Sequence, residues 1–189
     1  MAFLGLFIGI DRYLSPDVNE LSCARRDAVA LEALFTDTLG GKSTLLVDAE
    51  ATRTRVEAEF LALASCSPDD TVVIAFSGHG SETHELVTYD TQIQDLANTA
   101  ISLDLVQAWV SRIPARRVFF FLDGCCSGGI GAKVLQIEAK PRDLQSINAR
   151  LDQLAGEGRC SFPAASATEP AYEHSRYGHG FLTYYLLEA

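Results

Sequence analysis

The sequence is short of basic residues and has no long apolar run. Its 189 residues include 15 Lys and Arg against 25 Asp and Glu, which gives a formal net charge of −10. A surface this acidic repels the phosphate groups of nucleic acids and of anionic lipids. No stretch approaches the ~18 consecutive apolar residues that a membrane-spanning helix needs. We therefore expect neither nucleic acid nor a membrane as a direct partner.

Proline is also scarce, glycine is not enriched, and the cysteines form no framework. The chain has 14 Gly and 6 Pro but is 48% hydrophobic, so the composition excludes a disordered or collagen-like chain. Its length predicts one domain over residues 1–189. Five cysteines, two of them adjacent, are unlike a secreted disulfide scaffold. The apolar residues 1–10 lack the basic start and the cleavage site of a signal peptide, so we expect a buried first strand and a cytoplasmic location.

Short apolar runs alternate with segments of helical spacing. Runs typical of strands covered on both faces occur at residues 4–10, 43–47, 71–76 and 117–122. Helical spacing occupies residues 21–39, 54–64 and 102–113. We expect Thr54 and Glu57 to form a capping box that opens the second helix, and Ser102 to cap the third. This order predicts an α/β fold, with a mostly parallel central sheet and helices on both faces.

Two segments are less regular. Residues 82–100 are polar and mixed, which favours a small hairpin or a loop. Residues 132–158 are charged and contain Pro141, which is typical of a mobile linker. Residues 180–189 have the character of the beginning of a helix.

Two motifs follow the two most apolar runs, where this architecture carries its ligand sites. The first, Phe76-Ser-Gly-His-Gly-Ser81, sets His79 between glycines, so a substrate can approach an imidazole acting as a general base. The second, Leu122-Asp-Gly-Cys-Cys-Ser-Gly-Gly129, favours a sharp strand-to-helix turn that exposes Cys125 and aims backbone N–H groups at an oxyanion. A thiolate is stabilised near a helix N-terminus and beside a protonated histidine. Together the motifs predict a cysteine nucleophile with a histidine partner.

On these residues the chain resembles a bacterial member of the caspase and metacaspase superfamily of cysteine peptidases. Residues 8–13 and 24–31 are similar to the family's first strand and helix, and the two motifs are similar to its histidine and cysteine blocks. His79 lies 46 residues before Cys125, close to the spacing of about 50 in caspases. Metacaspases usually have a histidine where Cys126 stands in this chain.

The resemblance implies a caspase-like three-layer sandwich and a cysteine-type endopeptidase that works through a thioester acyl-enzyme. In it His79 is the general base or acid and Cys125 the nucleophile. The backbone N–H groups of Gly80 and Cys125 form the oxyanion hole. The substrate is a protein or peptide.

The resemblance also implies a specificity. Metacaspases cleave after Arg or Lys by means of acidic pocket residues, and Asp123 matches the one that precedes the nucleophile. Glu169, in residues 165–173, is the expected second carboxylate. Members of the family often cut themselves after the nucleophile. Self-cleavage within 132–158 is therefore expected at the basic residues Lys133, Lys140, Arg142 and Arg150.

No organic cofactor is implied. The sequence has neither Cys-x-x-Cys nor His-Glu-x-x-His, so we expect no zinc site. Many metacaspases need calcium, but no Asp-x-Asp-x-Asp-Gly loop occurs, and calcium activation stays open. An activator or partner domain that orders the pocket also stays open.

Two other functions stay open. Gly124-Cys-Cys-Ser-Gly128 fits a nucleophile elbow with Cys126 as the nucleophile, as in cysteine variants of α/β-hydrolases and in glutamine amidotransferases. In that case Glu173-His174 is the candidate partner pair. A caspase-like domain can also lose catalysis and serve as a scaffold, and an acidic surface suits a basic partner protein. The presence of both His79 and Cys125 favours the enzyme.

The remaining reactive residues are interpreted as structural. We expect Cys23, Cys66 and Cys160 to be buried and inert. We expect Asp27 to cap the first helix or to form a salt bridge there. Surface or hydrogen-bonding roles are expected for His84, His174 and His179.

Overall fold

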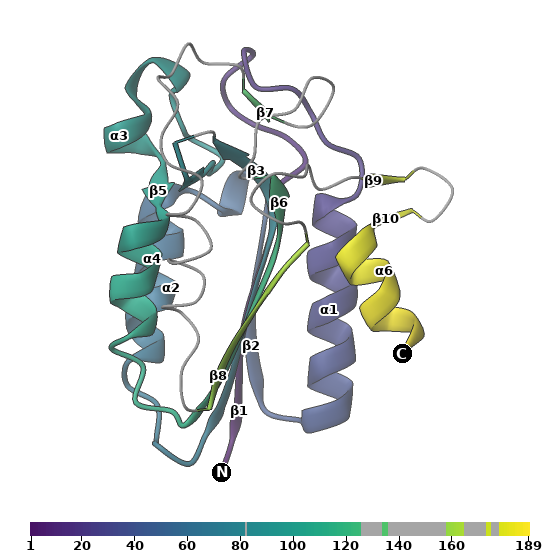
Figure 1. Ribbon diagram of the computed structural model, residues 1–189, viewed down its shortest axis with the longest axis vertical. Helices are drawn as coiled ribbons and strands as arrows, with labels where there is room; N and C mark the ends of the chain where they lie inside the picture. Colours follow the sequence, from purple (N-terminus) through teal and green to yellow (C-terminus); the bar gives the residue numbers. More distant parts are fainter. Residues whose placement is uncertain (82, 126–133, 136–157, 165–172, 175–177) are drawn as a thin grey trace.

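Figure 1 shows the computed structural model, which describes residues 1–81, 83–125, 134–135, 158–164, 173–174 and 178–189. Among these residues five parallel strands form the central sheet, in the order β2, β1, β3, β6, β8. They are β1 (Phe3–Gly9), β2 (Lys42–Val47), β3 (Thr71–Ser81), β6 (Arg117–Cys125) and β8 (Arg159–Pro163). Four of them coincide with the four apolar runs, so the predicted parallel sheet is confirmed.

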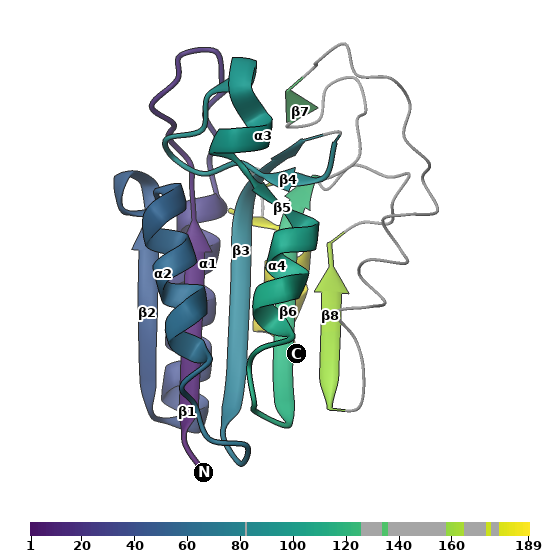
Figure 2. The ribbon, with the colours of Figure 1, turned by 90° about the vertical axis from the view of Figure 1, so that its left-hand side faces the viewer.

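Helices cover both faces of this sheet (Figures 1 and 2). One face carries α1 (Ala24–Leu39) and α6 (Phe181–Glu188), and the other carries α2 (Arg53–Leu63) and α4 (Leu103–Val110). The predicted three-layer arrangement is therefore confirmed. No helix of the described residues has the length and apolar character that crossing a membrane requires.

The strand side chains alternate between two hydrophobic cores. Ile8 of β1 packs in one core with Phe60 of α2 and Trp109 of α4. The ring centroids of Phe60 and Trp109 lie 5.2 Å apart. Phe7, the preceding residue of β1, packs in the other core with Leu31 of α1. All five side chains are buried. Burial on both faces explains why the strands appear in the sequence as continuous apolar runs.

The helix starts agree with the prediction in one case and differ in another. Ser102 caps α4 as expected, because its hydroxyl accepts a hydrogen bond from a backbone N–H of the first turn. The capping box expected at Thr54 is wrong. The helix begins earlier, and Thr52 is the cap, its hydroxyl accepting from the Arg55 N–H at 3.3 Å. Thr54 therefore lies inside the first turn.

The shorter elements lie at the carboxyl edge of the sheet and in the connections. β4 (Glu85–Leu86) pairs antiparallel with β3 and with β5 (Ile101–Ser102), so the expected small hairpin is present. The expectation that this segment lies outside the core is wrong, because Leu86 is buried in it. The turns η1 (Asp48–Glu50) and η2 (Ile93–Asp95) and the short helix α3 (Leu96–Thr99) belong to the connections. β7 (Val134–Leu135) pairs parallel with β3, and β9 (Glu173–His174) pairs antiparallel with β10 (His179–Gly180).

The carboxyl ends of β3 and β6 differ from the prediction. β1 pairs with β3 only as far as Gly9, opposite Ser77. β3 and β6 stay paired beyond that point, as far as His79 and Cys125. Backbone pairing needs no particular side chain, so the glycine-rich ends continue the strands. Both predicted catalytic residues therefore lie within paired strands. The sequence had predicted that they follow the strands.

Candidate active site

The pairing of β3 with β6 sets the backbone of His79 directly opposite that of Cys125. Neighbouring strands lie about 4.8 Å apart, so the two residues are side by side at the carboxyl edge of the sheet. The same register pairs Gly78 with Gly124 and Ser77 with Asp123. The fold thus brings together the two motifs that the sequence singled out. Cys126, the alternative nucleophile, lies outside the described residues.

The His79 side chain is buried and held from the β1 side. It is 1% exposed, and its Nε2 lies 2.8 Å from the carbonyl oxygen of Asn19. The Tyr13 ring packs against the imidazole, with ring centroids 5.2 Å apart and an interplanar angle of 40°. The Tyr13 hydroxyl accepts a hydrogen bond from the backbone N–H of His79 at 2.9 Å. Sequence reasoning singled out neither Tyr13 nor Asn19.

Gly80 continues β3 beyond the histidine. It is in register with Leu86 of β4 on one side and Val134 of β7 on the other. The turn that follows is organised by Glu85, whose carboxylate accepts hydrogen bonds from the hydroxyls of Ser81 and Thr83. The role of Gly80 in an oxyanion hole stays a prediction.

A buried carboxylate lies next to the histidine strand, on the face covered by α1. Asp27 of α1 is 1% exposed, and its oxygens face three donors. The Ser77 hydroxyl donates at 3.2 Å, the Gly180 N–H donates at 3.1 Å, and His179 Nδ1 lies at 2.7 Å. The expected helix cap by Asp27 is therefore wrong, because its partners come from β3 and β10, whereas the alternative expectation of a salt bridge is met by His179 when that imidazole is protonated. The α1 N-terminus is capped instead by Asp11, whose Oδ1 accepts from the Ala24 N–H at 2.8 Å.

Asp123 of β6, opposite Ser77, supplies a second negative charge beside Asp27, and we call the two carboxylates the acidic pair. The Oδ2 of Asp123 accepts hydrogen bonds from the hydroxyl and the backbone N–H of Thr183, at 3.1 and 3.4 Å. The chain passes so close that a Cβ at position 180 would collide with the Asp123 carboxylate, which explains the glycine there. Burial and the neighbouring negative charge of Asp123 raise the pKa of Asp27 to about 6, against the lowering effect of its bonds to His179 and Gly180.

Sequence reasoning gave Asp27 a structural role and missed its place beside the histidine strand, although the sequence contained a signal that Asp27 is buried. Ala24, Ala28 and Leu31 form the apolar stripe of the first helix, and position 27 lies on that stripe. A carboxylate on a buried face needs a partner, because an unpaired buried charge is costly. The partner, His179, is 152 residues away, so the sequence did not identify it.

The remaining predicted residues are those that the structure does not describe and the three cysteines that were expected to be buried. Outside the described residues lie the second predicted pocket carboxylate and the self-cleavage candidates: Glu169, Lys133, Lys140, Arg142 and Arg150. The cysteines expected to be buried behave differently from one another. Cys23 is buried, Cys66 is partly exposed and Cys160 is exposed, because Cys160 lies on the outermost described strand, β8.

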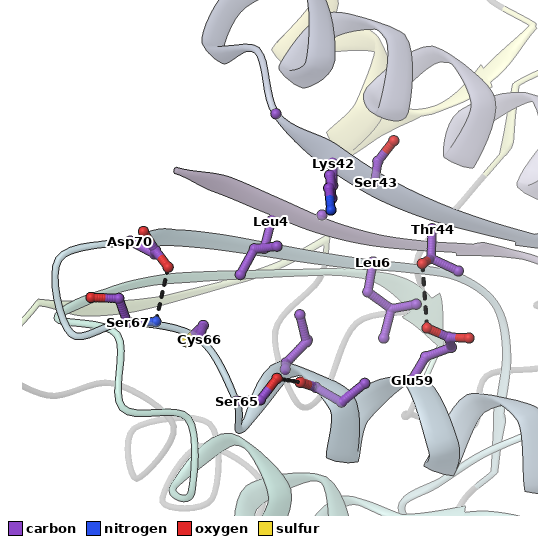
Figure 3. Close-up of a pocket in the computed structure, with 14 residues that line it drawn as sticks. Leu4, Leu6, Lys42, Ser43, Thr44, Glu59, Ser65, Cys66, Ser67 and Asp70 are labelled. Atoms are coloured by element: carbon purple, nitrogen blue, oxygen red, sulfur yellow. Dashed lines mark hydrogen bonds between the residues drawn. The ribbon is translucent and has the colours of Figure 1, made fainter. Parts of the chain in front are cut away.

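A cavity of about 890 Å³ lies at the opposite edge of the sheet, where the strands begin (Figure 3). Lys42 and Ser43 line it together with Cys66. Its polar groups bond to one another: the Thr44 hydroxyl donates to Glu59, and the Ser67 N–H donates to Asp70. The cavity is separate from the His79 and Cys125 edge. In the described part of the chain, no three His, Cys, Asp or Glu side chains are grouped so that they could hold a metal ion.

Comparison with known proteins identifies a family. The sequence profile of the caspase domain family matches residues 3–186. No curated protein matches the sequence significantly. A solved crystal structure from Geobacter sulfurreducens, a structural genomics target, is similar with a TM-score of 0.55 and 17% identity. The match covers 89% of this chain and 60% of that one, and at this identity it shows a shared fold alone.

The raised pKa of Asp27 predicts a pH-dependent stability. Folded Asp27 holds its proton up to a pH of about 6, whereas the unfolded carboxyl loses it near 3.8. The stability that this proton uptake contributes is present at low pH and is lost as the pH rises through 6. We expect the free energy of unfolding of the wild type, relative to Asp27→Asn, to rise by on the order of 2–3 kcal/mol from pH 7 to pH 4.

Urea denaturation at four pH values between 4 and 7 measures this difference. Asp37→Asn, on the exposed side of the same helix, is the matched control and should follow the wild type at every pH. Parallel profiles for the wild type and Asp27→Asn would contradict the prediction.

Proposed function

The chain belongs to the caspase domain family of cysteine peptidases, and from this premise we propose that it is an endopeptidase with Cys125 as nucleophile and His79 as general base. One observation carries the proposal, namely the register of His79 with Cys125 across β3 and β6. Both residues belong to the carboxyl edge of a parallel sheet, which is where folds of this kind carry their active sites.

The contacts of His79 support a direction for proton transfer. The Asn19 carbonyl can only accept, so Nε2 carries the hydrogen and Nδ1 holds the lone pair. In our proposal Nδ1 takes the proton of the Cys125 thiol, and the thiolate attacks the carbonyl carbon of the scissile bond. The tetrahedral intermediate collapses to a thioester as the C–N bond breaks, and His79 returns the proton to the leaving amine. Water, deprotonated by His79, then attacks the thioester carbon; the C–S bond breaks, the carboxylic acid product leaves, and His79 returns the proton to the Cys125 thiolate.

Backbone donors complete the proposed site. The N–H groups of Gly80 and Cys125 would bind the oxyanion of the tetrahedral intermediate. Such donors lower the barrier because they are already oriented toward the position at which negative charge develops.

We propose further that Asp123 and Asp27 recognise a basic residue before the scissile bond. Two like charges close together favour a cation, and their repulsion contributes to the raised pKa of Asp27. Asp27 is 1% exposed, whereas the His179 side chain bonded to it is 18% exposed. The imidazole therefore lies toward solvent from the carboxylate. A substrate Arg or Lys would reach Asp27 by taking the place of this imidazole.

Replacement of His179 tests the specificity proposal. We expect His179→Ala to lower KM for peptides with Arg before the cleaved bond by roughly tenfold, since the substrate cation no longer competes with the His179 imidazole for the Asp27 carboxylate. kcat should stay within about twofold of the wild type, because the dyad is untouched. Peptides with Gln at that position are the control and should not respond. An unchanged or higher KM for the Arg peptide would contradict the role of Asp27.

A panel of fluorogenic peptides ending in Arg, Lys, Asp or Gln tests the activity itself. We expect cleavage after Arg and Lys, reduced at least about 10³-fold in Cys125→Ala and in His79→Ala but kept in Cys126→Ala. Assays with and without calcium decide the calcium requirement. A denaturing gel of wild type beside Cys125→Ala decides whether the chain cuts itself within residues 132–158.

Two results of this panel would overturn the proposal. Loss of activity in Cys126→Ala alone would identify Cys126 as the nucleophile of a different hydrolase. No cleavage of any peptide by the wild type, with or without calcium, would contradict a peptidase activity of the chain alone and would leave two explanations, a non-catalytic scaffold or a missing activator.

A further inference from the structure

The hydrogen-bond ladder between β1 and β3 is interrupted at His79. Its last regular step is the bond from the Ile10 N–H to the Ser77 carbonyl, 3.0 Å long. In a parallel ladder, the next bond would run from the N–H of His79 to the carbonyl of Ile10. The Tyr13 hydroxyl stands between these two groups. It accepts from the His79 N–H at 2.9 Å and donates to the Ile10 carbonyl at 3.1 Å.

This insertion separates β1 from β3 at the histidine without losing a hydrogen bond. A buried N–H or carbonyl left unpaired is costly, so a strand that leaves a sheet needs substitute partners. One hydroxyl supplies both of them here. The Tyr13 hydroxyl fills the space between the two strands. β1 therefore leaves the sheet opposite Ser77, two residues before His79, and the residues that follow β1 can turn back over the imidazole.

The same segment also fixes the imidazole itself. The Tyr13 ring lies against the His79 ring, and Asn19, six residues further along, receives the Nε2 hydrogen bond. Tyr13 therefore acts on both the backbone and the side chain of the histidine. Rotation of the imidazole about χ1 or χ2 would break one of these contacts.

The segment is anchored at points away from the histidine. Asp48, which follows β2, accepts hydrogen bonds from the N–H groups of Asp11 and Arg12 at 2.9 and 3.0 Å. The Leu14 N–H donates to the Tyr89 carbonyl at 2.9 Å. Tyr13 thus lies between two fixed points, which limits its movement.

We propose that Tyr13 is a positioning residue of the catalytic dyad, which holds the backbone and the imidazole of His79 in register with Cys125. The inference rests on the proposed peptidase function of His79. The hydroxyl and the ring of Tyr13 have separate effects. The hydroxyl sets the separation of β1 from β3, and the ring sets the orientation of the imidazole. Tyr13 touches neither the substrate nor the reacting atoms in this proposal.

Tyr13→Phe tests the hydroxyl, because it keeps the ring. Without the hydroxyl, His79 loses its bridge to β1 and shifts relative to Cys125. We expect kcat for an Arg peptide to fall by about 10- to 100-fold while KM stays within about twofold, since misplacement of a catalytic group affects the chemical step. The pH dependence of kcat should also change. Tyr185→Phe, at a position 66% exposed on α6, is the matched control and should leave both unchanged.

Nuclear magnetic resonance of ¹⁵N-labelled histidine provides a readout that needs no activity. We expect the imidazole nitrogen shifts of His79 to change in Tyr13→Phe and to stay constant in Tyr185→Phe. Circular dichroism and the melting temperature confirm that each variant is folded at the assay temperature.

The outcomes separate this inference from the proposed function. Wild-type kcat, pH profile and His79 shifts in folded Tyr13→Phe would overturn the positioning role. A fall in activity that only follows the unfolded fraction, with unchanged His79 shifts, would overturn it as well. If the wild type cleaves no peptide, the proposed function fails, and the His79 shifts still decide whether Tyr13 positions the imidazole.

Discussion

The parallel pairing of β3 with β6 past the end of β1 determines where every other part of the site lies. Buried side chains on both faces fix its register, since Ile74 pairs with Phe120 in one core and Ala75 with Phe121 in the other. A slip by one residue would move each of these side chains into the opposite core, where its size and shape would no longer fit the space around it. The same register continues without interruption to His79 and Cys125. Core packing therefore sets the geometry of the candidate dyad.

Two segments from the ends of the chain complete the site on this framework. Residues 10–23 leave the sheet early and hold His79 through Tyr13 and Asn19. Residues 178–183 pack onto α1 and β6 and provide hydrogen bonds to the buried carboxylate of Asp27 and to the partly exposed carboxylate of Asp123. In the proposed mechanism the first segment orients the base, and the second controls access to the acidic pair. Both depend on the sheet, because the groups they contact belong to β3, β6 or the helix packed against them.

Local patterns in the sequence were sufficient for four of the five described parallel strands, for the helices that cover the sheet and for the two motifs, but they missed β8. Continuous apolar runs predict strands buried on both faces, and the cap at Ser102 was visible in the sequence. The ends of β3 and β6 were not predictable in this way. Their glycines indicate turns, but the backbones of the two strands pair with each other and so extend both strands. The partnership of Asp27 with His179 joins positions 152 residues apart. The bridge made by Tyr13 depends on where β1 departs from β3. Such contacts are set by tertiary structure: a local pattern can indicate that Asp27 is buried, but it does not identify the distant residue that is its partner.

Covalent capture by a peptidyl chloromethyl ketone with Arg next to the reactive group tests the central claim most directly. This reagent alkylates an active-site thiolate, and peptide mass spectrometry identifies the modified residue. The account predicts stoichiometric modification of Cys125 in the wild type and much slower modification in His79→Ala, with the exposed Cys160 as the reference for nonspecific alkylation. Modification of Cys126, or of Cys125 no faster than Cys160, would contradict it.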